Sequence, residues 1–391
     1  MPRNLRVVIV GAGIGGLAAA AALRKLGHEA VVYERSGELG EVGAGIQLGP
    51  NGVKVLFALG LERTLGGSAA EPTNMVSLAW DDAHLRSREP LKAVAVERYG
   101  APYLTAHRAD VHRLLQAMVP DNSVHLNARC VHVRADARGA AATFADGKEI
   151  EADVIVGADG IRSIVRESLF GEAPARWTEQ MAWRCIVPID RVPERVGPGR
   201  SVAIDRSEYV GWIGPNGHVI CYPIRGGELY NMFVGHVSQD WVAESWTAPS
   251  TREEMLAAHA GWNEALLEML GQVQDVYKWG IYDRDPLARW TVDRATLLGD
   301  AAHPMMPTLA QGASITLEDA YTLARNLARF ADDPGQGLKA YERERIDRAT
   351  RVQLQARQQF QNNRKNPAPP PLSRDWIFVH DATAEPAIAA E

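Results

Sequence analysis

The sequence predicts an α/β protein in which an antiparallel β-sheet domain is interleaved with a parallel-sheet domain and a C-terminal helix follows. Three observations predict this fold class. Residues 7–34, 153–170 and 295–327 each have the pattern of a strand, a glycine-containing turn and a helix. Residues 177–283 instead alternate polar and apolar residues between turns such as "GPNG" and "RGGE", as antiparallel hairpins do. Residues 337–364 keep the apolar spacing of a long helix.

Composition limits the classes of function. The chain has 391 residues, 46% hydrophobic and 23% charged, which is ordinary for a soluble globular protein of two domains or one domain with an insertion. A formal net charge of −6 argues against a nucleic-acid surface, and no apolar run is long enough for a membrane span. The cysteines lie far apart without metal-ligand spacing, so we expect no metal site and a reducing, cytoplasmic location: Cys130, Cys185 and Cys221.

The stretch "VVIVGAGIGGLAAAAAL" at residues 7–23 is either the core of a secretory signal or the start of a nucleotide-binding unit. Its glycines would break a signal helix, and no cleavage site follows. A second buried strand, "AVVYE", follows instead and ends at Glu34, 18 residues after Gly16. In the Gly11-x-Gly13-x-x-Gly16 fingerprint a pyrophosphate binds at the helix N-terminus and the acid binds a ribose hydroxyl. The stretch therefore predicts dinucleotide binding, with an ordinary glycine turn as the alternative.

Two aspartates stand where a strand ends and a helix is about to begin. Asp159 lies in "VIVGADGIRSIVRESL" and Asp300 in "ATLLGDAAHPMMPTLAQGASITLEDA". The carboxyl ends of parallel strands form the ligand-binding edge of an α/β sheet, so both carboxylates are candidates for cofactor contacts. Aspartate also caps helices well at such positions, and capping is the alternative for each.

Taken in order, GxGxxG, "GADGIRS" and "GDAAHP" make the chain resemble the single-component FAD-dependent aromatic hydroxylases, typified by p-hydroxybenzoate hydroxylase, from about residue 5 to about residue 375. The stretches "GAGIQLGPN", "YGAPYLTAHRADVHRLL", "GHVICYPIRGGELYN" and "HPMMPTLAQGASITLEDA" are similar to the branch with 3-hydroxybenzoate 6-hydroxylase, salicylate hydroxylase and 6-hydroxynicotinate 3-monooxygenase. The resemblance implies three parts: a Rossmann-like FAD-binding domain (1–72, 99–176 and 284–366), an antiparallel substrate domain (73–98 and 177–283) and an extended C-terminal tail (367–391).

The resemblance also implies how this chain would hold FAD. The three glycines would seat the pyrophosphate, Glu34 the adenosine ribose and Asp300 the ribityl chain. Asp159 lies in the motif that serves both FAD and NAD(P)H, and Cys130 would meet the adenine through its main chain. No second dinucleotide unit follows, so NADH or NADPH would bind only transiently. Two arginines would lie along the cofactor unless they form solvated ion pairs: Arg35 and Arg108.

The stretch "HPMMPTLAQGASITLEDA" is expected beside the flavin ring. A helix that begins with Gly312 and Ala313 offers free N–H groups to the negative charge of the reduced ring. The preceding proline-rich loop would keep the reactive face dry, and Pro307 offers a carbonyl but no N–H. His303 is a candidate catalytic residue, although the favoured interpretation is that it orders this loop.

The alternation in "HVICY" places His218, Ile220 and Tyr222 on one face of a strand and Cys221 on the other. His218 and Tyr222 are then about 13 Å apart along the strand and would bracket an aromatic ring. The resembled enzymes place such a histidine and tyrosine at the substrate. We therefore expect His218 to be the base that removes a phenolic proton and Tyr222 to hydrogen-bond the substrate. A histidine satisfied by a neighbour in the sheet is the alternative.

The stretch "GAGIQLGPNG" is interpreted as a loop that brings Gln47 near the ring system, where it would orient the substrate or the flavin edge. Its Gly43-x-Gly45 lacks the βαβ unit of a second nucleotide site. The hydroxynicotinate enzymes have a histidine at the position of Gln47, so the glutamine favours chemistry of the 3-hydroxybenzoate type.

The resemblance implies a monooxygenase that hydroxylates a hydroxylated aromatic carboxylate with NAD(P)H and O2 through a C4a-hydroperoxyflavin. Two alternatives remain: an FAD-dependent reductase or dehydrogenase acting on a larger lipid, and a flavin-binding sensor without turnover. A homodimer is also considered, because three apolar residues of the tail would dock on the body or on a second subunit: Trp376, Ile377 and Phe378.

Overall fold

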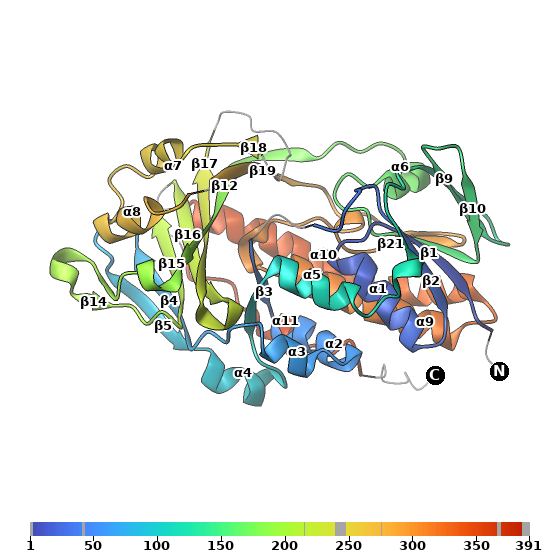
Figure 1. Ribbon diagram of the computed structural model, residues 1–391, viewed down its shortest axis with the longest axis horizontal. Coiled ribbons are helices and arrows are strands. Elements are labelled where there is room, and N and C mark those ends of the chain that lie inside the picture. The colour runs from blue at the N-terminus through green and yellow to red at the C-terminus, as the bar shows by residue number, and fades with distance from the viewer. Residues whose placement is uncertain are drawn as a thin grey trace.

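The computed structural model describes residues 3–40, 44–214, 216–238, 248–274, 276–365 and 369–384. Two large sheets lie toward opposite ends of an elongated molecule (Figure 1). The predicted α/β fold class is confirmed. Gly43 and parts of the expected tail (367–368 and 385–391) lie outside the described residues.

The first sheet has six strands and is parallel except for one edge pair. Its central strand carries the run Val7–Val10, which is buried on both faces, as parallel sheets covered by helices require. β1 pairs in parallel with the β2 and β11 strands on either side of it. In spatial order the strands are β20 (Thr291–Val292), β21 (Ala295–Leu297), β11 (Val154–Gly157), β1 (Arg6–Val10), β2 (Glu29–Tyr33) and β7 (Val124–His125).

Helix α1 (Ile14–Lys25) follows the glycine turn and packs on α9 (Gly312–Arg329). The alanines that follow its first turn are all buried, because their small side chains let the helix approach both the sheet and α9 closely. Leu26 and Gly27 end it, with Arg24 and Lys25 in the last turn. The remaining helices are α2 (Pro50–Leu59), α3 (Glu62–Gly66), α4 (Lys92–Tyr99), α5 (Arg108–Gln116), α6 (Ile164–Phe170), α7 (Arg252–Ala258), α8 (Glu264–Leu270), α10 (Pro334–Asn363) and α11 (Asp375–Phe378).

The second sheet has eight strands, antiparallel as expected apart from the parallel pair β4–β15. Its longest strand, β12, carries a bulge between Trp177 and Gln180. In spatial order the strands are β18 (Ala248–Pro249), β19 (Tyr277–Asp283), β12 (Arg176–Pro188), β17 (Leu229–Val237), β16 (Gly217–Ile224), β15 (Tyr209–Gly214), β4 (Asn74–Ala79) and β5 (Leu85–Pro90).

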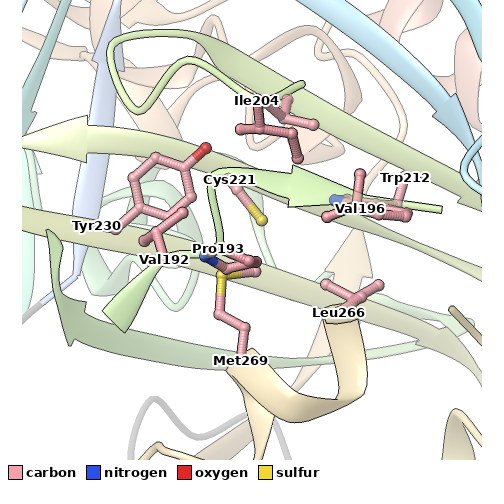
Figure 2. A pocket seen from close by; sticks show the side chains of 10 residues that line it. Val192, Pro193, Val196, Ile204, Trp212, Cys221, Tyr230, Leu266 and Met269 are labelled. Carbon is pink, nitrogen blue, oxygen red and sulfur yellow. The ribbon is translucent and has the colours of Figure 1, made fainter. Parts of the chain in front are cut away.

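The two faces of the eight-stranded sheet pack against different parts of the molecule. One face buries Val219 and Cys221 in an apolar core with α7 and α8. Figure 2 shows Cys221 pointing into a small apolar cavity of this core, beside Leu266 and Met269 of α8. The other face carries Tyr222 and Phe233, which face the first sheet's side of the molecule. The alternation predicted for "HVICY" is therefore the one observed, and the cavity lies on the face opposite Tyr222.

Smaller elements complete the fold. A three-stranded antiparallel sheet joins β10 (Glu149–Ala152), β9 (Ala140–Phe144) and β8 (Cys130–Ala135). Two-stranded sheets join β13 (Arg195–Val196) with β14 (Val202–Ala203), and β3 (Gly45–Leu48) with β6 (Leu104–His107). Short 3-10 helices are η1 (Asp121–Ser123), η2 (Ile189–Arg191), η3 (Pro198–Arg200), η4 (Arg225–Gly227), η5 (Gly299–Ala301) and η6 (Pro307–Leu309).

Two local expectations are corrected by the structure. Gln47 lies in strand β3 rather than in a loop, because β3 pairs with β6 through Gln47 and Thr105. The expected extended tail contains one helical turn, α11, which packs against α2 (Figure 1). Ile377 and Phe378 are buried on the body of the same chain, and the Trp376 indole donates to Gln355 of α10 at 2.9 Å.

No described helix is both long and apolar enough to cross a bilayer. Within the described ranges, no group of three or more His, Cys, Asp or Glu side chains has the arrangement of a metal site.

Candidate active site

The predicted cofactor residues meet at one edge of the parallel sheet. Gly11 and Glu34 directly follow strands β1 and β2. Asp159 lies two residues after β11, and Asp300 lies three residues after β21. Main-chain hydrogen bonds lock these loops together: Gly11 N donates to Tyr33 O at 2.8 Å, Ala158 N to Val10 O at 2.8 Å, and Leu298 N to Gly157 O at 2.9 Å. This is the edge at which α/β sheets bind ligands.

The glycine loop has the shape of a dinucleotide clamp. A Cβ at Gly16 would lie 1.9 Å from Gly11 O, so only glycine lets α1 approach the loop this closely. A Cβ at Gly13 would meet nothing within 4 Å, so this side of the loop is open. No side chain caps the N-terminus of α1, and its first turn has no acidic residue. The first N–H groups of α1 therefore fit the pyrophosphate of FAD.

Glu34 lies directly against this loop. Its carboxylate accepts hydrogen bonds from Ala12 N at 2.8 Å and Ser36 N at 2.9 Å, which holds it beside the clamp. The buried His112 also supports the glycine loop, since its Nε2 lies 2.7 Å from Ala12 O. No sequence pattern had pointed to this histidine. Arg35, next to Glu34, is exposed.

Asp159 performs the capping role that was weighed as its alternative. Its Oδ1 accepts from Ser163 Oγ at 2.5 Å and its Oδ2 from Ile164 N at 2.8 Å, which caps α6. The backbone N–H groups of α6 are thus satisfied internally, unlike those of α1. Burial raises the pKa of Cys130 to about 11, and the nearby charge of Asp159 adds to this, so the buried thiol stays neutral.

Asp300 lies in η5, at the start of the loop that leads to α9. Solvent reaches its side chain, yet enough protein surrounds it for desolvation to raise the pKa of its carboxyl. The charges of His303 and Arg108 oppose this rise, so a residue 192 positions away in the sequence acts on this carboxyl. A carboxylate in this setting fits the hydroxyl-rich ribityl chain of FAD.

The N-terminus of α9 is also uncapped. No side chain caps it, its first turn has no acidic residue, and a Cβ at Gly312 would meet nothing within 4 Å. Gly312 and Ala313 are both partly exposed. The positive end of this 18-residue helix therefore fits the anionic edge of a reduced flavin.

His303 is held in a buried charge network beneath the proline-rich loop. Its Nε2 lies 2.5 Å from Asp319 Oδ2, and only 1% of the residue is exposed. Arg345 of α10 bridges Asp319 at 2.7 Å and Glu318 at 2.5 Å. Burial opposes ionisation of both acids, but the neighbouring cations lower the pKa of Asp319 and bring that of Glu318 to about 2. These contacts favour the loop-ordering interpretation of His303.

Two hydrogen bonds join the same loop to α10. Gln353 donates to Pro304 O at 2.9 Å, and Thr308 donates to Ala356 O at 2.6 Å. Pro307 lies between these two attachment points and is exposed. The loop thus presents Pro307 outward on a rigid support.

His218 and Tyr222 lie on one face of β16, as predicted. Across the sheet, His218 pairs with Gly235 and Ile220 with Phe233. The imidazole stacks on the Phe233 ring, with centroids 5.4 Å apart, and no described residue forms a hydrogen bond with it. Burial lowers the pKa of His218 to about 4, with a smaller contribution from His259, so the ring is neutral at pH 7. A histidine satisfied by a neighbour in the sheet stays the alternative to a catalytic base.

Tyr222 belongs to a polar cluster of three tyrosines and a glutamine. Tyr103 donates to Gln47 Oε1 at 2.6 Å, and the Tyr209 and Tyr222 rings stack with centroids 6.2 Å apart. Burial raises the pKa of all three tyrosines, so each hydroxyl is neutral. The sequence analysis missed Tyr103 and Tyr209. Tyr103 precedes strand β6 within "YGAPYLTAH", one of the stretches that carry the family resemblance, and that resemblance was the available signal.

Two hydrogen bonds join the eight-stranded sheet to strands β3 and β6. Gly45 N donates to Asn231 Oδ1 at 2.6 Å, and Thr105 Oγ1 donates to Pro223 O at 2.6 Å. A Cβ at Gly45 would lie 2.6 Å from the Tyr222 ring, so glycine is needed for β3 to approach β16. Arg184 adds a cation above this face, with its Cζ 3.9 Å from the centroid of the Trp279 ring.

Comparison with known proteins places this arrangement in a family. The family model of an FAD binding domain matches residues 4–356. A 3-amino-4-hydroxybenzoate 2-monooxygenase from Streptomyces platensis is 40% identical over 353 residues, which are 90% of this chain and 87% of that protein. A 6-hydroxynicotinate 3-monooxygenase from Bordetella bronchiseptica is 35% identical over 388 residues, 98% of this chain and 97% of that protein.

A solved structure agrees with this placement. The substrate complex of a salicylate hydroxylase has a TM-score of 0.81 to this fold with 26% identity, and the match covers 99% of each chain. Nothing in these matches supports the reductase alternative. The resemblance inferred from the three motifs is confirmed, and the chain belongs to the family of FAD-dependent aromatic monooxygenases.

Proposed function

We propose that the protein hydroxylates a hydroxylated aromatic carboxylate of the hydroxybenzoate, aminohydroxybenzoate or hydroxynicotinate type, with NADH or NADPH as reductant. The observation that carries this proposal is the face of β16. A neutral imidazole, His218, lies at one end and the Gln47–Tyr103–Tyr222 cluster at the other. The named relatives act on aromatic acids of this kind, which supports the substrate class.

The residues that would hold FAD follow from the fit described above. The open glycine loop and α1 would take the pyrophosphate, Glu34 the ribose, and Asp300 the ribityl chain. Gly312 and Ala313 would face the anionic edge of the ring. Arg108, Arg35 and the main chain of Cys130 are proposed to line the cofactor, with Asp159 supporting it by fixing α6. When bound, FAD supplies hydride acceptance from NAD(P)H and activation of O2.

The chain's own residues would make the aromatic ring reactive. An electrophilic oxygen attacks a ring more readily when its hydroxyl group is ionised, and His218 is placed to accept that proton. Burial keeps the imidazole neutral and available, and the phenolate formed beside it would stabilise the imidazolium by opposite charge. Tyr222 and Gln47 would hydrogen-bond the substrate and fix its orientation. His303 and Pro307 would keep the loop beside the reacting atoms ordered and dry.

A panel of aromatic acids tests this proposal. Hydroxybenzoates, 3-amino-4-hydroxybenzoate and hydroxynicotinates should be added singly to the FAD-loaded protein with NADH or NADPH. The correct acid should accelerate NAD(P)H oxidation and O2 uptake and give a hydroxylated product. Rapid NAD(P)H oxidation with a reduced lipid as product would support the reductase instead. A protein that no compound stimulates would be a flavin-binding sensor.

Replacement of Asp300 by alanine should weaken FAD binding by roughly 10- to 100-fold, the loss expected for a hydrogen bond to a charged acceptor. The dissociation constant can be measured by fluorescence titration of apoprotein with FAD. Asp347→Ala, at an exposed position on α10, is the control and should leave FAD affinity unchanged. Equal FAD affinity in Asp300→Ala and the control would remove Asp300 from the cofactor site.

We further propose a cytoplasmic enzyme, because its cysteines are buried free thiols and NAD(P)H is available there. The homodimer considered from the sequence stays a prediction. Light scattering coupled to size-exclusion chromatography would determine the oligomeric state.

A further inference from the structure

Arg374 reaches the tyrosine cluster from a distant part of the chain. It lies in the C-terminal tail, immediately before α11. Its Nη2 is 3.0 Å from Sδ of Met75, and its Cζ is 5.4 Å from the centroid of the Phe378 ring. The side chain is half-buried. Arg374 of the tail therefore contacts strand β4 of the eight-stranded sheet.

Both neighbours of this guanidinium lie beside tyrosines of the polar cluster. Met75 pairs with Tyr209 across β4 and β15. The Phe378 ring lies 5.8 Å from the Tyr103 ring. The guanidinium charge also opposes the effect of burial on the pKa of both tyrosines. Arg374 thus lies at the Gln47–Tyr103–Tyr222 end of the face that carries His218.

The positive charge of Arg374 has no carboxylate partner among the described residues. The adjacent Asp375 is already engaged by Arg98 at 2.6 Å and by the Tyr99 hydroxyl at 2.6 Å. A guanidinium carries five N–H donors, whereas the thioether of Met75 is a weak acceptor. Other partly buried arginines of the chain do have such partners, for example Arg225 with Asp110 at 3.0 Å. A half-buried guanidinium beside neutral hydroxyls favours an anion from outside the protein.

We propose that Arg374 binds the carboxylate of the aromatic substrate. This inference rests on the proposed function and names the group that recognises the acid. The carboxylate would lie between the guanidinium and the Tyr103 and Tyr222 hydroxyls, which leaves the ring hydroxyl toward His218. The tail would then be part of the substrate site, and its docking on α2 and α10 would hold Arg374 in place.

Calorimetric titration of the FAD-loaded enzyme tests the inference without requiring turnover. Each aromatic acid is compared with its carboxamide, which has the same shape but no charge. The wild type should prefer the acid. Arg374→Gln should weaken acid binding by roughly 10- to 100-fold and leave amide binding unchanged, since a charge-assisted contact is lost. Arg374→Lys should restore part of the acid preference.

Arg351→Gln is the matched control. Arg351 holds the tail from its outer side, with its Cζ 3.9 Å from the centroid of the Trp376 ring, so its loss reports loosening of the tail alone. The control should keep the acid preference. Equal weakening of acid and amide in Arg374→Gln, or no weakening at all, would overturn the inference, as would a wild type that binds no aromatic carboxylate.

The same titrations separate this inference from the proposed function. If the wild type binds acids through Arg374 but hydroxylates none of them, the function is wrong and the carboxylate site stands. If it hydroxylates only neutral phenols, the monooxygenase assignment stands and the carboxylate site is wrong.

Discussion

Replacing His218 with alanine should reduce hydroxylation by ~10²–10⁴-fold, the usual contribution of a positioned general base. FAD binding should be unchanged, because His218 lies on the eight-stranded sheet and not at the edge where the glycine loop lies. The substrate should still stimulate NADH oxidation, but the ring hydroxyl would stay protonated and unreactive. The activated oxygen should then be released as hydrogen peroxide.

The measurement is product formed per NADH consumed, with and without catalase, over a pH series. Because burial lowers the pKa of His218 to about 4, the wild-type imidazole stays neutral well below pH 6.5, and the acid limb of hydroxylation should extend toward pH 4. His236→Ala is the control, since its ring lies with Trp183 and His259 on the opposite face. If His218→Ala keeps wild-type coupling and pH profile, His218 is not the base, and His303 becomes the next candidate.

Replacing Arg345 with methionine should lower the free energy of unfolding by about 3–5 kcal/mol, the cost of leaving buried charges without their partner. Arg345 is 1% exposed and neutralises Glu318 and Asp319, which are both fully buried. Arg348 would still reach Glu318, but among the described residues Asp319 would keep only the His303 imidazole and the Gly299 N–H. The loop that carries His303 and Pro307 should therefore loosen as well.

Denaturant unfolding monitored by circular dichroism would measure this loss. Arg343→Met, at an exposed position on the same helix, should change the unfolding free energy by no more than about 0.5 kcal/mol. The folded pKa of Glu318 is depressed from 4.5 to about 2, so the network stabilises the fold above pH 4.5 and loses this effect as the pH falls toward 2. The difference between wild type and Arg345→Met should shrink over that range. A constant difference at all pH values would contradict the network account.

The parts of the fold that the sequence could predict are those coded by local patterns. The glycine spacing, the buried valine run of β1 and the acid at the end of β2 all lie within one continuous stretch, so their mutual placement follows from strand and helix geometry. His218 and Tyr222 were placed on one face by alternation alone. The capping role of Asp159 depends on Ser163 and Ile164, a few residues away, so the local sequence already offers it as an alternative to a cofactor contact.

The parts that escaped prediction depend on pairing between distant segments. Residues 45–48 form a strand only because β6 offers a partner, which a single stretch does not reveal. Tyr103, Tyr209 and Arg374 come from three separate parts of the chain and meet only when β4, β15 and the tail are assembled. The proline-rich sequence of the tail predicts an extended segment. Ile377 and Phe378 are nevertheless buried against the rest of the chain and belong to a helical turn.

The most direct test of the account is the origin of the oxygen atom in the product. The FAD-loaded enzyme is supplied with NADH, the aromatic acid selected from the panel and 18O2, and the product is analysed by mass spectrometry. The account predicts one 18O atom in the new ring hydroxyl, with one NADH consumed for each product formed. A product that carries oxygen from water, or NADH oxidation with no oxygen incorporated, would contradict it.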